Sequence, residues 1–305
     1  MKFKYFEDPC IYPKAQKNET ELQGARLANT RDGISITKFL YWLKNEITID
    51  ETDEILAAKK LFTLRKNNDL FYSLSFETIS AADQHSALPH YRVTKESNLR
   101  FKKNSIYLVD SGAQYLDGTT DITRTIILGS PTKEQKDRFT RVLKGHIAIA
   151  NCVFEEGARG SLLDPLARKS LNDIGCDYDH GTGHGIGSFL SVHEGPQRIA
   201  KFTGLSDGKI MEGMIISNEP GFYKKGEYGI RTENLIIAKK KLNSQLEFEV
   251  ISWAPIDVEL IENSLLTVEE KEWVNWYHQE VYNKLSDQLD RKEKSWLKKV
   301  TCPIH

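Results

Sequence analysis

Apolar residues recur three or four positions apart in several long stretches of the chain, a spacing that predicts amphipathic helices. Gly33 lies inside the first of these stretches and could kink that helix. Near the C-terminus, Thr267 and Glu270 fit a capping box, which predicts that a helix begins there. The helices expected from this pattern cover residues 18–47, 51–66, 131–154 and 162–173, and the tail from residue 267.

Short runs rich in β-branched and aromatic residues separate the helical stretches and predict strands. These runs cover residues 76–82, 105–110, 122–128, 214–219, 229–238 and 248–251. The order of helices, strands, two helices, strands and a final helix indicates an α+β fold rather than regular βαβ winding. Pro9 and Pro13 fall in a segment with little pattern, so residues 1–17 are expected to form an N-terminal arm.

Composition and charge narrow the functional classes. The 305 residues include 42 Lys and Arg against 43 Asp and Glu, a formal net charge of −1, which favours neither nucleic acid nor an anionic membrane as partner. The four cysteines are scattered without a Cys-x-x-Cys pair, which indicates reduced thiols (Cys10, Cys152, Cys176 and Cys302). No stretch approaches the ~20 apolar residues of a membrane span. We therefore expect a cytoplasmic protein.

Two aspartates flank a turn signal. Asp110 ends an apolar run, where a carboxylate is costly unless it is paired or coordinated. Asp121 follows eleven residues later, beyond the turn signal Asp117-Gly118, and a hairpin would place both acids side by side. Like charges repel there unless a cation lies between them. The alternative is that both are turn or capping residues.

Histidines gather in a glycine-rich segment, His180-Gly-Thr-Gly-His184-Gly-Ile-Gly, and His193 follows nine residues after His184. Glycines let the backbone pack closely around the imidazoles. A single histidine is usually a structural residue, but three in such a segment favour a functional site.

Two further acids end or interrupt apolar runs. Glu219 follows the run 215–217 at a Pro-Gly turn. In the expected strand 229–238, side chains alternate between faces, so Arg231 and Glu233 would share one face. The alternative for this pair is an ordinary surface ion pair.

Together these residues offer one imidazole and four carboxylates, from Asp110, Asp121, His184, Glu219 and Glu233. Such hard ligands favour Mn²⁺ or a similar first-row ion over a structural zinc. Their charge of −4 would balance two divalent cations, and two metals ~3.5–4 Å apart can share a hydroxide and clamp a tetrahedral intermediate. Composition and spacing therefore indicate a metal-assisted hydrolase, and they do not identify its reaction more closely.

Six segments in this order resemble aminopeptidase P (Xaa-Pro aminopeptidase), in the family of pita-bread metallopeptidases that includes methionine aminopeptidase, prolidase and creatinase. The resemblance runs from about Pro13 to near the C-terminus and is closest to the cytosolic type. The segments that carry it are residues 110–115, 121–125, 180–187, 192–196, 218–223 and 229–234.

The resemblance implies a pita-bread fold, in which helices flank a curved antiparallel sheet. It would divide the chain into a catalytic domain at 18–262 and a C-terminal helical extension at 263–305. It also implies two divalent metal ions, with Mn²⁺ favoured and Co²⁺ or Zn²⁺ as alternatives. Asp110 would bind one ion, His184 and Glu219 the other, and Asp121 and Glu233 both.

The resemblance further implies catalytic and substrate-binding roles. Glu219 would act as general base, and His193 would steady the scissile carbonyl. His90 would contact the substrate, while three further residues would line the pocket or orient the ligands (His180, Tyr223 and Arg231). The reaction implied is release of the N-terminal residue from a peptide whose second residue is proline.

The chain departs from the family pattern in two respects. Aminopeptidase P proteins of this type carry further domains before the catalytic one, which help to close the site and form the dimer. A homodimer, or a partner chain that supplies those domains, is therefore considered. In addition, residues 83–85 stand where the family has a glycine-proline turn before His90.

Other functions stay open. A methionine aminopeptidase or a prolidase-like peptidase would use a similar centre. A shortened, catalytically impaired relative would act at most as a module that binds peptides or proteins.

Overall fold

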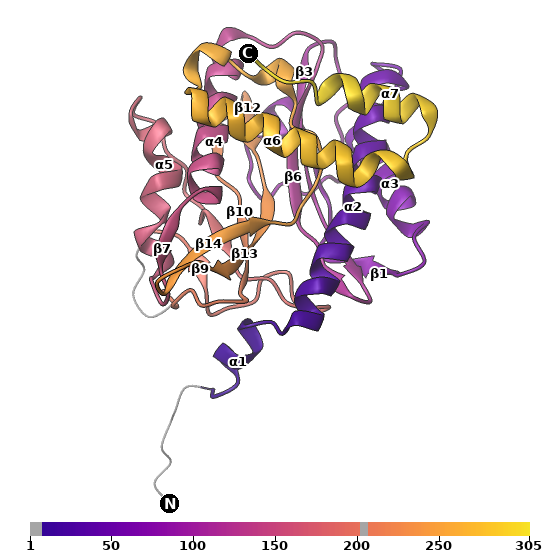
Figure 1. Ribbon diagram of the computed structural model, residues 1–305. Helices are drawn as coiled ribbons and strands as arrows, with labels where there is room; N and C mark the ends of the chain where they lie inside the picture. The colour runs from indigo at the N-terminus through magenta and orange to yellow at the C-terminus, as the bar shows by residue number, and fades with distance from the viewer. Residues whose placement is uncertain (1–7, 202–206) are drawn as a thin grey trace, which may run out of the picture.

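The computed structural model describes residues 8–201 and 207–305, so residues 1–7 of the expected N-terminal arm lie outside the described residues. Figure 1 shows the strands between two groups of helices, with α2 and α3 on one side and α4 and α5 on the other, while α6 and α7 cross the top. The helices are α1 (Ile11–Ala15), α2 (Glu19–Asn45), α3 (Glu54–Lys66), α4 (Lys133–Ala150), α5 (Asp164–Asn172), α6 (Val268–Leu285) and α7 (Arg291–Val300).

Antiparallel pairing joins the strands into small sheets, which confirms the α+β class. One sheet has the order β2-β3-β6 (Ile79–Ala82, Ser105–Ser111, Ile122–Leu128). Another has the order β10-β13-β14-β7 (Ile215–Asn218, Asn234–Lys240, Gln245–Val250, Val153–Glu155). The smaller sheets are β1-β4-β5 (Phe71–Leu74, Ala113–Tyr115, Gly118–Thr119), β11-β12 (Gly221–Lys224, Tyr228–Arg231) and β8-β9 (Gly183–His184, Arg198–Ile199).

The hairpin expected around Asp117-Gly118 is present. β3 pairs with β6 so that Asp110 faces Thr123 across the ladder, and Asp121 immediately precedes β6. Every residue of both strands is buried, so the two aspartates enter the interior from neighbouring strand ends.

Helix α2 begins at a capping box, in which Asn18 and Glu21 satisfy each other's backbone N–H groups. It continues without interruption from Glu19 through Gly33 to Asn45. A Cβ on Gly33 would lie 2.1 Å from the carbonyl oxygen of Trp253. The glycine therefore permits close packing of α2 against the loop after β14. The second expected capping box, Thr267 with Glu270, begins α6.

Two expected boundaries were wrong. The helix expected to reach residue 154 ends at Ala150, because residues 153–155 pair with β14 as an edge strand. The strand expected at 229–238 is two strands, β12 and β13, which are interrupted at Thr232 and Glu233. They pair with different neighbours: Arg231 with Gly221 of β11, and Asn234 with Asn218 of β10.

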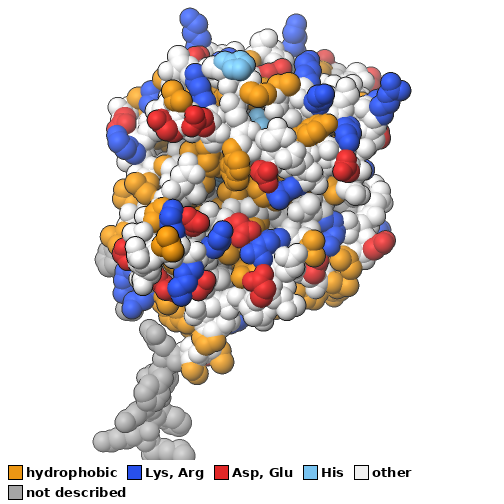
Figure 2. Space-filling model, viewed as in Figure 1, with side chains coloured by type: hydrophobic (Ala, Val, Ile, Leu, Met, Phe, Trp, Pro, Cys, Tyr) orange, Lys and Arg blue, Asp and Glu red, His pale blue; other side chains and the backbone are white. Residues whose placement is uncertain are grey.

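The surface agrees with the balanced composition. Figure 2 shows basic and acidic side chains interspersed over one face of the molecule. None of the described helices is long and apolar enough to cross a membrane. In the described part of the chain, all four cysteines are free.

Candidate metal centre

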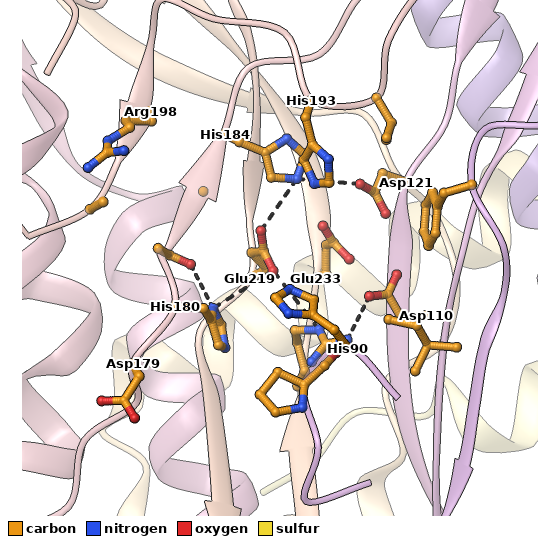
Figure 3. Close-up of a pocket in the computed structure, with 18 of the residues that line it drawn as sticks. His90, Asp110, Asp121, Asp179, His180, His184, His193, Arg198, Glu219 and Glu233 are labelled. Atoms are coloured by element: carbon orange, nitrogen blue, oxygen red, sulfur yellow. Dashed lines mark hydrogen bonds and ion pairs between the residues drawn. The ribbon is translucent and has the colours of Figure 1, made fainter. Parts of the chain in front are cut away.

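The five expected metal ligands converge on one cavity from separate elements. Their side chains line a cavity of about 680 Å³ (Figure 3). Asp110 belongs to β3 and His184 to β8, while the other three lie at strand ends (Asp121 before β6, Glu219 after β10 and Glu233 between β12 and β13). These three acids lie just outside the regular strands, and their side chains line the cavity.

The side-chain atoms of three of the expected ligands lie close together. One side-chain atom each from Asp121, His184 and Glu233 lie within 4.8 Å of one another. His184 Nδ1 lies 3.0 Å from the Gly185 carbonyl oxygen and donates to it, so Nε2 carries a lone pair. That Nε2 is 3.6 Å from Asp121 Oδ2 and 3.4 Å from Glu219 Oε1. Acceptors that face each other in this way repel unless a proton or a cation lies between them.

Two buried carboxylate oxygens support the same conclusion. In the described part of the chain, Asp110 Oδ1 and Asp121 Oδ1 have no hydrogen-bond partner. An unsatisfied buried acceptor costs about 1–3 kcal/mol, and more when it is charged. A divalent cation would satisfy both oxygens, so these residues fit the metal pair that the motifs imply.

Burial sets the protonation of the metal-free centre. It raises the pKa of Asp121 and of Glu233 well above the usual carboxyl range, and the neighbouring acids add to the shift. Burial also raises the pKa of Glu219 to about 8, although the nearby Arg231 opposes the change. The pKa of His184 falls to about 4 through burial, so its imidazole is neutral, the form that binds a metal.

Buried donors orient the carboxylates. Arg231, whose side chain is only 3% exposed, donates from Nη2 to Asp110 Oδ2 at 2.6 Å, and its Nε lies 4.0 Å from Glu219 Oε2. Thr123 Oγ1 donates to Glu233 Oε2 at 2.6 Å. These bonds leave one oxygen of each carboxylate directed toward the cavity, as metal ligands require.

A chain of hydrogen bonds connects three of the expected pocket residues. Arg231 Nη1 donates to the Tyr223 hydroxyl at 2.6 Å, and that hydroxyl lies 2.7 Å from His180 Nε2. His180 Nδ1 donates to the Gly181 carbonyl oxygen, so Nε2 accepts from Tyr223. Burial lowers the pKa of His180 to about 3, which keeps it neutral. His180 and Arg231 line the cavity, whereas Tyr223 lies behind its wall.

His193 and His90 approach the cavity from exposed loops. The ring centre of His193 is 4.2 Å from that of His184, which places it beside the ligand cluster. His90 is connected to the centre through its neighbour, because the Pro89 carbonyl accepts from Arg231 Nη2 at 3.3 Å. Residues 83–85, which depart from the family pattern, form a single 3-10 turn ahead of this loop. Figure 3 shows both rings turned toward the carboxylates.

Two groups of residues around the centre were missed by the sequence analysis. His146 of α4 is fully buried, donates from Nδ1 to the Asn218 carbonyl at 3.0 Å, and has Nε2 3.2 Å from Asn234 Nδ2. It therefore supports the residues next to Glu219 and Glu233. Its only signal was a histidine on an apolar helix face, a pattern that is usually structural. Charged residues also line the cavity (Arg168, Asp179, Arg198 and Lys201).

Comparisons with known proteins agree with this geometry. The model of metallopeptidase family M24 matches residues 23–240, and that of the C-terminal region of peptidase M24 matches residues 244–304. A probable Xaa-Pro aminopeptidase P of Coprinopsis cinerea is 46% identical over 301 residues, which are 95% of this chain and 48% of that protein. The chain thus spans about half the length of the curated relatives it matches.

Solved structures share the fold. The crystal structure of X-prolyl aminopeptidase from Caenorhabditis elegans, described as a cytosolic enzyme with a di-nuclear active site, has a TM-score of 0.91 and 39% identity. The match covers 97% of this chain and 50% of that one. Xaa-Pro dipeptidase from Bacillus anthracis has a TM-score of 0.69 and 27% identity over 81% of this chain and 64% of that one. These neighbours confirm the pita-bread fold expected from the motifs.

Proposed function

The chain belongs to metallopeptidase family M24, and on that premise we propose that it is an aminopeptidase that releases the N-terminal residue from peptides with proline in second position. The observation that carries this proposal is the set of four carboxylates and one neutral imidazole around a single cavity. The names of the Coprinopsis cinerea and Caenorhabditis elegans relatives support the choice of Xaa-Pro peptides over other substrates.

The proposed ligands are divided as the motifs imply. Asp110 would hold one ion, His184 and Glu219 the second, and Asp121 and Glu233 would bind both. We favour Mn²⁺, because four of the five ligands are hard carboxylates. When bound, such ions supply an acidified water and polarise the substrate carbonyl.

Side chains of the protein would then accept the proton and stabilise the charge that develops on the substrate. Glu219 is proposed as general base, since its carboxylate lines the cavity, with Oε1 3.4 Å from His184 Nε2 and 3.3 Å from Ser217 Oγ, and Oε2 4.0 Å from Arg231 Nε. His193 would donate a hydrogen bond to the scissile carbonyl oxygen and its developing charge. His90, His180, Tyr223 and Arg231 would contact the peptide or hold the ligands.

Location and assembly are part of the proposal. We propose a cytoplasmic enzyme, supported by the description of the Caenorhabditis elegans neighbour as cytosolic. A homodimer, or an assembly with a partner chain, is also part of the proposal. Light scattering on the purified chain, alone and at substrate saturation, would report the oligomeric state.

Hydrolysis of Ala-Pro-Pro by metal-free protein, and then by the same protein with Mn²⁺ added, tests the proposal. Release of alanine only after addition of Mn²⁺ is the expected result. A Met-Ala-Ser peptide and an Ala-Pro dipeptide run in parallel separate this activity from those of a methionine aminopeptidase and a prolidase. No hydrolysis of any peptide by protein that binds two ions would contradict the proposed activity.

Glu219→Gln is expected to abolish nearly all hydrolysis while the fold is kept, because the amide can neither accept a proton nor bind a cation as a carboxylate does. The loss should be at least ~10²-fold in kcat, the size of a general-base contribution. Circular dichroism and peptide kinetics on the same samples check both parts. Turnover within tenfold of the unchanged chain would remove Glu219 from this role.

A further inference from the structure

Lys17 precedes α2 and lies outside the part of the chain that the family model matches. Its ammonium is nevertheless buried beside the loop that carries His193. Its side chain is 1% exposed, and Nζ lies 2.5 Å from Glu194 Oε1. Glu194 is itself nearly buried, with 7% of its side chain exposed. The family match begins only at residue 23. A buried ion pair therefore connects the N-terminal segment to the residue that follows His193.

The backbone around Lys17 is fixed as well. Its N–H donates to the Gly213 carbonyl at 3.0 Å, and Nζ also donates to the Lys14 carbonyl at 2.6 Å. Gln16 forms an isolated β-bridge with Met214, one residue before β10. The N-terminal segment is thereby bound to the same sheet that leads to Glu219.

On the other side of the pair, the loop that carries His193 is held closely. The Glu194 N–H donates to the Gly185 carbonyl at 2.9 Å, directly after the ligand His184. A Cβ on Gly187 would lie 2.9 Å from Glu194 Oε2, so the carboxylate packs against the glycine-rich segment. A shift of Glu194 would therefore move the neighbouring His193 relative to the ligands.

We propose that Lys17 is a positioning residue for His193: its buried ion pair with Glu194 holds the loop 185–197 so that the His193 ring stays beside the metal ligands. Only the expected effect of Lys17 on catalysis rests on the proposed function. The reason is electrostatic, because loss of Lys17 leaves the buried Glu194 carboxylate with an exposed, solvent-screened lysine as its ion-pair partner, and water entering the loop must then solvate the acid.

Lys14 offers an internal comparison. Its Nζ lies 2.9 Å from the other oxygen of Glu194, but its side chain is 52% exposed. Exposed ion pairs contribute little, since solvent screens them. Glu194 therefore has one buried ion-pair partner, Lys17, and one exposed partner, Lys14.

The test compares Lys17→Met, Lys14→Met and the double variant Lys17→Met/Glu194→Gln in the full chain loaded with Mn²⁺. Lys17→Met should lower kcat by about 10–100-fold, the usual effect of removing a group that orients a site residue, with KM and bound metal little changed. Lys14→Met should lower kcat less than about threefold. The double variant should recover much of the loss, because the buried carboxylate is neutralised together with its buried partner.

Hydrogen exchange gives a readout that does not need hydrolysis. Amides of residues 185–197 should exchange faster in Lys17→Met than in Lys14→Met, and the double variant should restore their protection. If the unchanged chain does not hydrolyse Ala-Pro-Pro, the proposed function fails while exchange still decides the role of Lys17.

Equal kcat values and equal exchange in the two single variants would overturn the proposal. So would a fall in bound metal that matches the fall in kcat, because Lys17 would then support the ligands rather than His193. If Lys17→Met does not fold, the double variant decides: normal exchange of 185–197 together with normal kcat supports a pairing role, and a persistent loss of both contradicts it.

Discussion

His193 differs from the five proposed ligands in its position. It comes from an exposed loop rather than from a strand end, and only its ring approaches the cluster. Burial of the ring lowers its pKa, which favours the neutral imidazole that can donate a hydrogen bond without carrying a charge toward the cations. This position suits contact with the substrate better than binding of a metal.

His193→Ala is therefore expected to lower kcat by at least about 10²-fold, as removal of a donor to a developing oxyanion does, while both ions stay bound. Peptide kinetics together with metal analysis by mass spectrometry check the two expectations. His184→Ala serves as the comparison, because it should lose bound metal. Loss of metal from His193→Ala to the same extent would make His193 a ligand.

His278 predicts an acid dependence of stability away from the metal centre. Burial lowers its pKa to about 4, and its Nε2 accepts from the Ile256 N–H at 3.1 Å, which requires the neutral ring. Its folded-state pKa is below the ordinary value of about 6.5, so protonation favours the unfolded chain. The contribution of neutral His278 to the free energy of unfolding is complete above pH 6.5 and is lost as the pH falls toward 4.

The free energy of unfolding should accordingly fall by roughly 2–3 kcal/mol more between pH 6.5 and pH 4 in the unchanged chain than in His278→Asn. Denaturant titrations at several pH values in that window measure both slopes. Parallel curves for the two proteins would show that His278 is protonated equally easily in both states.

At the scale of residues, the sequence was informative where a charged side chain interrupts an apolar run. Asp110 and Glu219 were found this way, because a carboxylate at a buried strand end needs a compensating charge. His146 and Lys17 could not be found by the same reasoning, since one lies on an ordinary helix face and the other in a segment without a pattern. Their roles depend on contacts between residues far apart in the chain.

Among the elements, helix α6 reaches the centre through a buried hydrogen-bond network. The Tyr277 hydroxyl accepts from Arg124 Nη2 at 2.7 Å, and Arg124 Nη1 donates to the Glu233 carbonyl at 2.7 Å. The Tyr277 ring stacks on Trp273 at 5.3 Å. The C-terminal helical region thus supports the backbone of one proposed ligand.

Tyr277→Phe should lower the free energy of unfolding by about 1–3 kcal/mol, because buried partners lose a hydrogen bond. It should also weaken metal binding about tenfold through Arg124. Calorimetric metal titration and chemical denaturation measure the two effects. Tyr282→Phe, a partly buried tyrosine on the same helix, is the control, and equal effects in both variants would argue against the network.

Helices were easier to predict than strands. The periodic pattern located α2, α4 and α6 because each buries one face along many residues. Strands β1, β8 and β11 were missed, since two to four residues carry too little pattern. The division between β12 and β13 was also missed, because both halves are apolar and only the pairing partners differ.

At the scale of the whole molecule, the metal pair is expected to stabilise the fold. Four carboxylates share one cavity, and cations that bind only the folded state add stability by mass action. Mn²⁺ at 100 times its dissociation constant should add about 2.7 kcal/mol, or roughly 5–10 °C in Tm. Thermal scans in chelator and in excess Mn²⁺ measure the shift, with Asp110→Asn/Glu233→Gln as the control that should not respond.

Glu219 lies between β10 and β11, and Glu233 lies between β12 and β13, so both acids lie where the pairing of neighbouring strands is interrupted. On one side of the interruption Asn218 pairs with Asn234, and on the other side Gly221 pairs with Arg231. In evolutionary terms, an insertion or deletion of one residue here would turn a carboxylate to the opposite face of the sheet. Length changes among descendants of this chain should therefore collect in the β11–β12 turn, at residues 225–227, and spare residues 219–220 and 232–233 between the paired strands.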